Sequence, residues 1–119
     1  MIDTLIPNAE RIARLNDRVR HSLDHSARVV ITRGCLETFC SGDFPEALMA
    51  QAELMRCIRQ FDFAEDAHGE RDFGKLTFRG RDIYFKIDYF DLSLEYGSED
   101  PADASQTTRV LTIMLSEEY

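Results

Sequence analysis

The feature that most constrains the fold is a β-hairpin pattern between residues 74 and 90. Along 83–89 apolar and polar types alternate, which places one set of side chains on one side of a strand: Ile83, Phe85, Ile87 and Tyr89. Residues 76–78 are also strand-forming, and the segment 79–82 between the two, RGRD, is typical of a hairpin connection. A strand that alternates in this way has a core side and a wetter side. The chain therefore predicts an antiparallel sheet.

Two segments have the apolar spacing of amphipathic helices. Residues 9–23 carry an apolar stripe with arginines off the stripe. Residues 43–60 carry a second stripe, and Asp43 precedes Glu46 by three positions with Pro45 between them, as at many helix starts. Both segments are predicted to pack on the sheet.

The C-terminal segment 101–117 fits two structures. Asp100 followed by Pro101 is typical of a helix start, and an apolar stripe at helical spacing follows. The same segment alternates at Leu111, Ile113 and Leu115, as a strand would. We favour the helix because the start signal is clear and the segment is long.

Three shorter segments complete the prediction. Residues 28–32 are β-branched and end at a glycine, which indicates a buried strand; 34–42 is expected to be a loop, and 92–96 one more antiparallel strand. The fold predicted for 1–119 is a single α+β domain, a small antiparallel sheet with about three helices packed on one face.

The sequence indicates a cytoplasmic protein. No stretch is apolar enough to cross a bilayer, and the N-terminus lacks the basic and apolar regions of a signal peptide. The three cysteines, Cys35, Cys40 and Cys57, are an odd number, which argues against a disulfide framework. Reduced thiols are therefore expected.

Nucleophilic catalysis has candidate residues but no motif. Cys35 or Cys40 would need a base, which the chain offers in His21, His25 or His68. No spacing marks one cysteine–histidine pair, and Cys57 with the histidines does not complete an established zinc pattern. We interpret the thiols as structural and expect no cofactor.

A metal site is the alternative that would make the protein an enzyme. His68, Glu70 and Asp72 lie close together in the sequence, and Asp88 would join them if the strand end folds back. Nitrogen and carboxylate ligands of this kind bind divalent cations. The spacing matches no established ligand pattern, so the competing interpretation is a loop whose acids cap turns and pair with arginines.

The negative charge is concentrated in one segment. The chain has a formal net charge of −8, and residues 62–103 hold twelve acidic against five basic residues, a net of −7. Such a surface repels a phosphate backbone, so we expect no direct nucleic-acid binding. It favours a basic partner.

Four segments resemble a known family of short bacterial proteins. They are 68–74 (HGERDFG), 86–91 (KIDYFD), 96–103 (YGSEDPAD) and 108–115 (TRVLTIML). The family is a domain of unknown function often carried on plasmids and integrated mobile elements, and the resemblance spans about residues 10–119. It implies a setting rather than a mechanism, without an established activity, cofactor or catalytic residue.

The charge and this setting lead to one functional hypothesis. Small acidic proteins of plasmids and phages recurrently block host defence systems by occupying a basic nucleic-acid groove. We expect a non-catalytic inhibitor that binds a basic surface of a host defence complex, a CRISPR effector or a restriction enzyme; acidity that serves only solubility is the competing interpretation. The candidate partner-binding residues are Glu65, Asp66, Glu70, Asp72, Asp88, Asp91, Glu95, Tyr96, Glu99 and Asp100.

Overall fold

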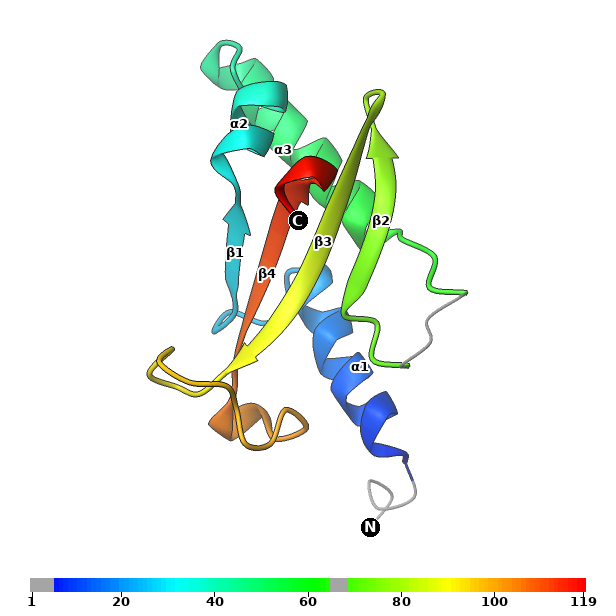
Figure 1. The fold of residues 1–119 in the computed structure, drawn as a ribbon, viewed down its shortest axis with the longest axis vertical. Helices are drawn as coiled ribbons and strands as arrows, with labels where there is room; N and C mark the ends of the chain where they lie inside the picture. Colours follow the sequence, from blue (N-terminus) through cyan, green and yellow to red (C-terminus); the bar gives the residue numbers. More distant parts are fainter. Residues whose placement is uncertain (1–5, 65–68) are drawn as a thin grey trace.

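The sheet has four strands in the order β1-β4-β3-β2 (Figure 1). The computed structural model describes residues 6–64 and 69–119. The elements in chain order are α1 (Asn8–Arg20), β1 (Arg28–Ile31), α2 (Arg33–Phe39), α3 (Phe44–Arg59), β2 (Phe73–Phe78), β3 (Arg81–Phe90), a short 3-10 turn η2 (Ala104–Gln106), β4 (Thr108–Leu115) and a second one, η3 (Ser116–Glu118). The predicted α+β class is confirmed.

The predicted hairpin is formed by β2 and β3, which pair antiparallel from Phe73 opposite Lys86 to Phe78 opposite Arg81. The turn is tighter than the predicted four-residue connection. Only Arg79 and Gly80 link the strands, and both have positive φ, 50° and 83°, as the twist of a two-residue hairpin turn requires.

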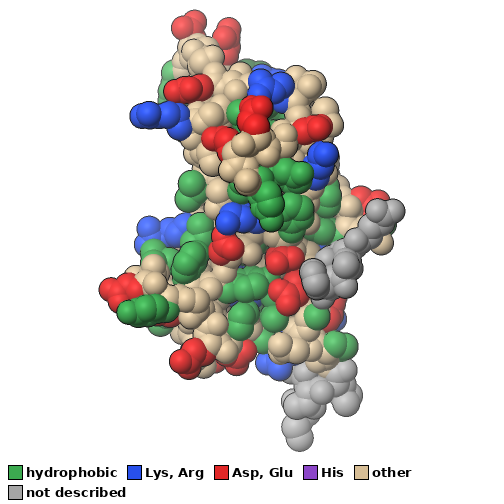
Figure 2. Space-filling model, viewed as in Figure 1, with side chains coloured by type: hydrophobic (Ala, Val, Ile, Leu, Met, Phe, Trp, Pro, Cys, Tyr) green, Lys and Arg blue, Asp and Glu red, His purple; other side chains and the backbone are tan. Residues whose placement is uncertain are grey.

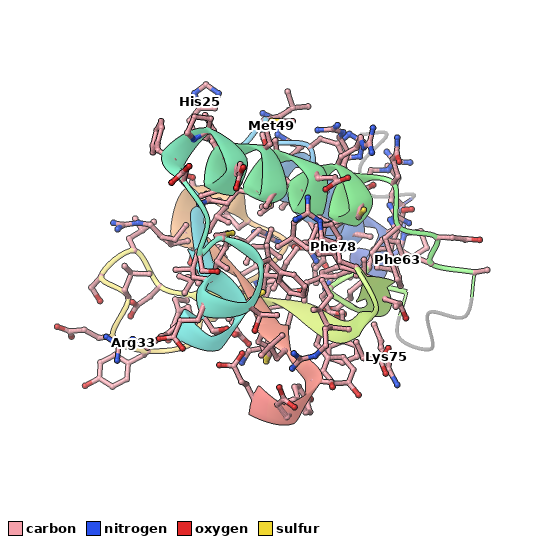
Figure 3. All side chains as sticks on the ribbon, turned by 90° about the horizontal axis from the view of Figure 1, so that it is seen from above. His25, Arg33, Met49, Phe63, Lys75 and Phe78 are labelled. Atoms are coloured by element: carbon pink, nitrogen blue, oxygen red, sulfur yellow. The ribbon has the colours of Figure 1, made fainter. Side chains whose placement is uncertain are left out.

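One face of the sheet packs on α1 and α3. The inward side chains of β3 that the sequence singled out, Ile83, Phe85 and Ile87, are all buried. In Figure 3, α3 lies along one side of the sheet with Phe78 beneath it, whereas Lys75 lies on the opposite side. The helices predicted at 9–23 and 43–60 are thus confirmed as α1 and α3.

The helix favoured for 101–117 is wrong, because residues 108–115 form β4. This strand lies between β1 and β3, so its backbone groups can pair on both edges, and six of its eight residues are buried. A central strand with most of its side chains buried is rich in apolar residues and can therefore also show helical spacing. The helix-start signal forms only turns: Asp103 accepts a hydrogen bond from the Ser105 amide at the start of η2.

Strand β1 forms, but it is not buried as predicted. It lies at the edge of the sheet, parallel to β4, so the sheet is mixed rather than wholly antiparallel. Val29 and Val30 are 50% and 44% exposed. The β-branched run that indicated a buried strand also suits an edge strand, because strand propensity does not specify burial.

Two of the predicted connections differ as well. The loop predicted at 34–42 is wrong for most of its length, because Arg33–Phe39 forms α2, whose first turn is capped by the Thr32 hydroxyl oxygen accepting from the Cys35 amide. The strand expected at 92–96 is a series of turns, joined to the sheet by one bridge between Phe90 and Gly97. Among the described helices, none is long and apolar enough to span a membrane.

Candidate protein-interaction surface

The connection from β3 to β4, residues 91–106, is the most negatively charged surface segment. It holds five carboxylates and no lysine or arginine: Asp91, Glu95, Glu99, Asp100 and Asp103. The connection, called here the acidic connection, projects from one end of the sheet (Figure 1). Because these acids all lie on one connecting loop, they share one region of the molecular surface.

Hydrogen bonds within the acidic connection hold its first turn. The Asp91 carboxylate accepts from the Ser93 hydroxyl at 2.8 Å and from the Glu95 amide at 3.1 Å, while the Asp91 amide donates to the Tyr96 carbonyl at 2.8 Å. The bond from Ser93, followed by those from backbone amides, lowers the pKa of Asp91. This carboxylate therefore stays ionised while it orders the turn.

The second half of the connection is held in a similar way. Asp103 accepts from the amide and hydroxyl of Ser105, at 2.9 and 2.6 Å, and from the side-chain amide of Gln106. The hydroxyl of Ser105, the first of these influences, lowers the pKa of Asp103. Asp100 accepts from the Ala102 amide. Glu95 and Glu99 are exposed acids for which no side-chain partner exists among the described residues.

Apolar side chains stand among these acids. Leu92 and Tyr96 are 66% and 72% exposed, and Leu94 is 38% exposed. Leu94 also has a φ of 62°, a conformation that costs a β-carbon-bearing residue about 1–2 kcal/mol. Figure 2 shows hydrophobic side chains beside acidic ones on this face of the molecule. Exposed apolar and aromatic groups of this kind are typical anchors of protein interfaces.

The other predicted partner-binding residues are dispersed. Glu65 and Asp66 lie outside the described residues. Asp88 is on the face of the sheet away from the helices, 3.1 Å from the ammonium group of Lys86. Asp72 is half-buried just before β2, with its backbone carbonyl accepting from the Ile87 amide. The described acids therefore do not form one continuous face from 62 to 103.

Glu70 belongs to an interior polar network rather than to an exposed surface. Its carboxylate accepts from the Tyr89 hydroxyl at 2.8 Å, and Asn16 donates both to the Glu70 carbonyl and to the Tyr89 oxygen. Arg109 donates from Nε to the Asn16 side-chain oxygen and from its terminal nitrogen to the Pro101 backbone carbonyl. The network ties α1 to β3, β4 and the end of the acidic connection.

Arg109 and Asn16 were missed by the sequence-based reasoning. Arg109 is 2% exposed, lies 5.0 Å from the Tyr89 ring centroid, and has no carboxylate within ion-pair distance among the described residues. Burial lowers the pKa of Arg109 and, as the main cause, raises that of Tyr89. An arginine inside the apolar run 108–115 is the signal that could have indicated a buried polar partner.

A neighbouring set of ion pairs anchors the segment before β2. Arg71 donates to Asp17 at 2.8 and 2.9 Å and to Glu10 at 3.2 Å, so the segment is fixed to α1. Arg20 also pairs with Asp17, and its guanidinium stacks 4.6 Å from the Phe63 ring centroid. These contacts stabilise the fold without forming an open site.

The proposed metal cluster is not assembled within the described residues. His68 lies outside them, Glu70 is hydrogen-bonded to Tyr89, and no group of three His, Cys, Asp or Glu side chains in the described ranges has metal-binding geometry. The thiol of Cys35 is fully buried, and burial, with the charges of Glu118 and Cys40, raises its pKa to about 11. It is therefore a core side chain rather than an activated nucleophile.

A family model described as a protein of unknown function, DUF3768, matches residues 39–118, from the end of α2 to the end of η3. The chain belongs to this family. No curated protein and no solved structure matches this chain. The DUF3768 match spans α3, β2, β3, the acidic connection and β4, whereas α1 and β1 lie outside the matched region.

Proposed function

We propose that this protein is a non-catalytic interaction protein that binds a positively charged protein surface through the acidic connection. The observation that carries the proposal is the composition and exposure of residues 91–106: five carboxylates without a cation, and Leu92 and Tyr96 standing exposed among them. Charged groups speed the encounter with an oppositely charged surface, and apolar side chains supply contact energy at its centre.

The turns of the acidic connection favour binding energetically. Asp91 and Asp103 hold the loop through their own hydrogen bonds, so less conformational freedom is lost when a partner is bound. The carboxylates of Glu95 and Glu99 do not hold the loop by hydrogen bonds of this kind, so they are the ones most available to a partner. The acidic connection therefore combines ordered turns with exposed carboxylates that can contact a partner.

The class of partner follows from the charge. Protein surfaces dense in lysine and arginine are typically those that bind nucleic-acid phosphates, and an array of carboxylates competes for them. The mobile-element setting that the resemblance implies adds a biological role. We therefore propose an inhibitor of a host defence complex, a CRISPR effector or a restriction enzyme, that occupies its basic nucleic-acid-binding surface.

The test is a pull-down from a bacterial host lysate, with mass spectrometry of the retained proteins. A basic nucleic-acid-binding assembly should be retained, and added double-stranded DNA should displace it. Retention should fall as salt rises from 50 to about 300 mM, because screening shortens the range of the charges.

Charge reversal gives the matched comparison. Glu99→Lys should reduce retention about tenfold, whereas Glu37→Lys, the same charge change at an exposed position on α2, should leave it within about twofold. Retention of a metabolic enzyme alone, or retention indifferent to salt and to Glu99→Lys, would refute the proposal.

A further inference from the structure

A shallow groove of about 520 Å³ runs beside the acidic connection. It is lined mainly by apolar side chains: Ala27, Val29, Val30, Phe90, Leu94 and Val110. Leu94 belongs to the acidic connection, so the groove and the acidic surface are continuous. Its volume lies in the range of pockets that accept a large side chain or a small ligand.

The groove borders the free edge of β1. In the described sheet β1 pairs with β4 alone, and the Thr32 amide donates to the Ile113 carbonyl at 3.0 Å. Backbone groups of a strand alternate in direction, so Val30 shares the orientation of Thr32, while Val29 and Ile31 direct their N–H and C=O groups away from β4. Two residues of β1 therefore offer hydrogen bonds to an added strand.

A second copy of the chain is a poor occupant of this edge. Antiparallel pairing of two β1 strands about Val30 places Arg28 opposite Thr32 of the other copy, beside Arg33 of that copy. Arg28 and Arg33 are exposed, and neither has an ion-pair partner among the described residues. Like charges brought together across a pair of strands oppose the pairing.

The charge at the end of the groove favours a basic segment. Asp91 and Glu95 flank the turn that carries Leu94, and the acidic connection has no cation of its own. Among the described residues, Arg28 is the one cation that lines the groove. A strand with an apolar centre and a lysine or arginine beyond it would place its apolar side chain in the groove and its charge beside these carboxylates.

We propose that the partner engages this surface with an extended basic–apolar segment that adds to the free edge of β1 and inserts one apolar side chain into the groove beside Leu94. This inference rests on the proposed function and specifies how the partner is held. Backbone hydrogen bonds to β1 supply affinity, the groove selects a large apolar side chain, and the acidic connection selects the neighbouring positive charge.

The experiment is a titration of the ¹⁵N-labelled protein with two synthetic peptides, followed by amide chemical shifts. The first is the acetylated, amidated peptide Ser-Val-Leu-Val-Ser-Lys-Lys, whose lysines lie at one end only, and the second carries serine in place of its three apolar residues. The first peptide should shift the amides of Val29, Ile31 and Leu94 and bind about tenfold more tightly than the serine peptide. Methylation of its central backbone nitrogens should remove that advantage.

Two variants of the protein locate the binding. Val30→Arg, which places a cation on the groove without burying it, should reduce the affinity of the apolar peptide to that of the serine peptide. Arg28→Glu, which removes the cation that lines the groove, should strengthen binding of the apolar peptide about threefold or more. Thermal unfolding of each variant, compared with the wild type, shows that the fold is retained.

The outcomes separate the two proposals. If both peptides shift only residues of the acidic connection and bind equally, the β1 groove is not used and this inference is overturned, whereas the proposed function stands. If neither peptide shifts the acidic connection, the proposed function fails and this inference fails with it. Tighter binding of the apolar peptide to the Val30→Arg variant would likewise contradict the proposed use of the groove.

Discussion

Asn16 on α1 and Arg109 on β4, 93 positions apart in the chain, meet at a hydrogen bond of 2.8 Å between Arg109 Nε and the Asn16 side-chain oxygen. Both side chains are buried. The same Asn16 amide nitrogen serves Glu70 and Tyr89, so one short side chain satisfies polar groups from three other parts of the fold.

Asn16→Ala should therefore be costly. It removes the acceptor of Arg109 Nε and the donor to the Tyr89 oxygen and the Glu70 carbonyl, and we expect a loss of about 3 kcal/mol in the free energy of unfolding. Urea denaturation measures this change in the free energy of unfolding. Asn8→Ala, at an exposed position on the same helix, should change stability by less than about 0.5 kcal/mol. Equal effects of the two variants would show that the network is not stabilising.

Phe85 should be a principal core residue. Its ring is fully buried and lies 5.2 Å from the Phe61 centroid, so Phe85→Ala should cost about 3–5 kcal/mol. Phe73→Ala, which truncates a 41% exposed ring on the neighbouring strand, should cost clearly less. An unchanged melting temperature for Phe85→Ala would mean that the packed face has been assigned to the wrong side of the sheet.

Gly74 has a role that its neighbours define. A β-carbon at this position would collide with the Phe85 ring and approach the Phe61 ring to 2.8 Å. Gly74→Ala should therefore lower the free energy of unfolding by about 1–3 kcal/mol through overpacking. Gly97→Ala is the matched control, because the nearest atom to its β-carbon lies 3.8 Å away. A stabilised Gly74→Ala protein would contradict the close approach.

Acid should weaken the contact between α1 and the segment before β2. Partial burial raises the pKa of Asp17, but the hydrogen bond from Arg71 and the charges of Arg20 and Arg71 outweigh it, and the net pKa is lower than usual. A carboxyl whose pKa is lower in the folded state contributes stability above the unfolded value near 3.9, and loses it as the pH falls through the folded value.

The test compares the wild type with Arg71→Met by urea denaturation at pH 6 and at about pH 2.5. The stability difference between the two proteins should be larger at pH 6 and should shrink in acid, because protonated Asp17 no longer pairs with Arg71. A difference that is independent of pH would mean that these ion pairs contribute nothing measurable.

The three thiols should differ in reactivity. Cys35 is fully buried with a pKa raised to about 11 by burial, followed by the charges of Glu118 and Cys40, whereas Cys40 and Cys57 are only partly buried. With a chromogenic disulfide reagent at pH 8, Cys40 and Cys57 should react first and Cys35 only when the protein unfolds. Cys35→Ser should leave the early phase unchanged; a loss of that phase would contradict the burial of Cys35.

Local patterns determined the class of the fold and part of its core. The alternation along 83–89 specified the inward face of β3, and the stripes of α1 and α3 specified two helices, because each pattern follows the periodicity of a single element. The negative charge of the acidic connection could also be counted from the sequence, since charge does not depend on how the chain folds. Whether the acids share a surface could not be counted in this way.

The tertiary structure decided what depends on neighbours. Residues 108–115 are apolar at both helical and strand spacings, and only their position between β1 and β3, where both edges of the segment are paired, makes them a strand. The same holds for the exposed edge of β1, for the withdrawal of Glu70 into the network with Asn16 and Arg109, and for the groove between β1 and Leu94. Each results from contacts between residues distant in the chain, whose free energies depend on burial and partners that no local pattern contains.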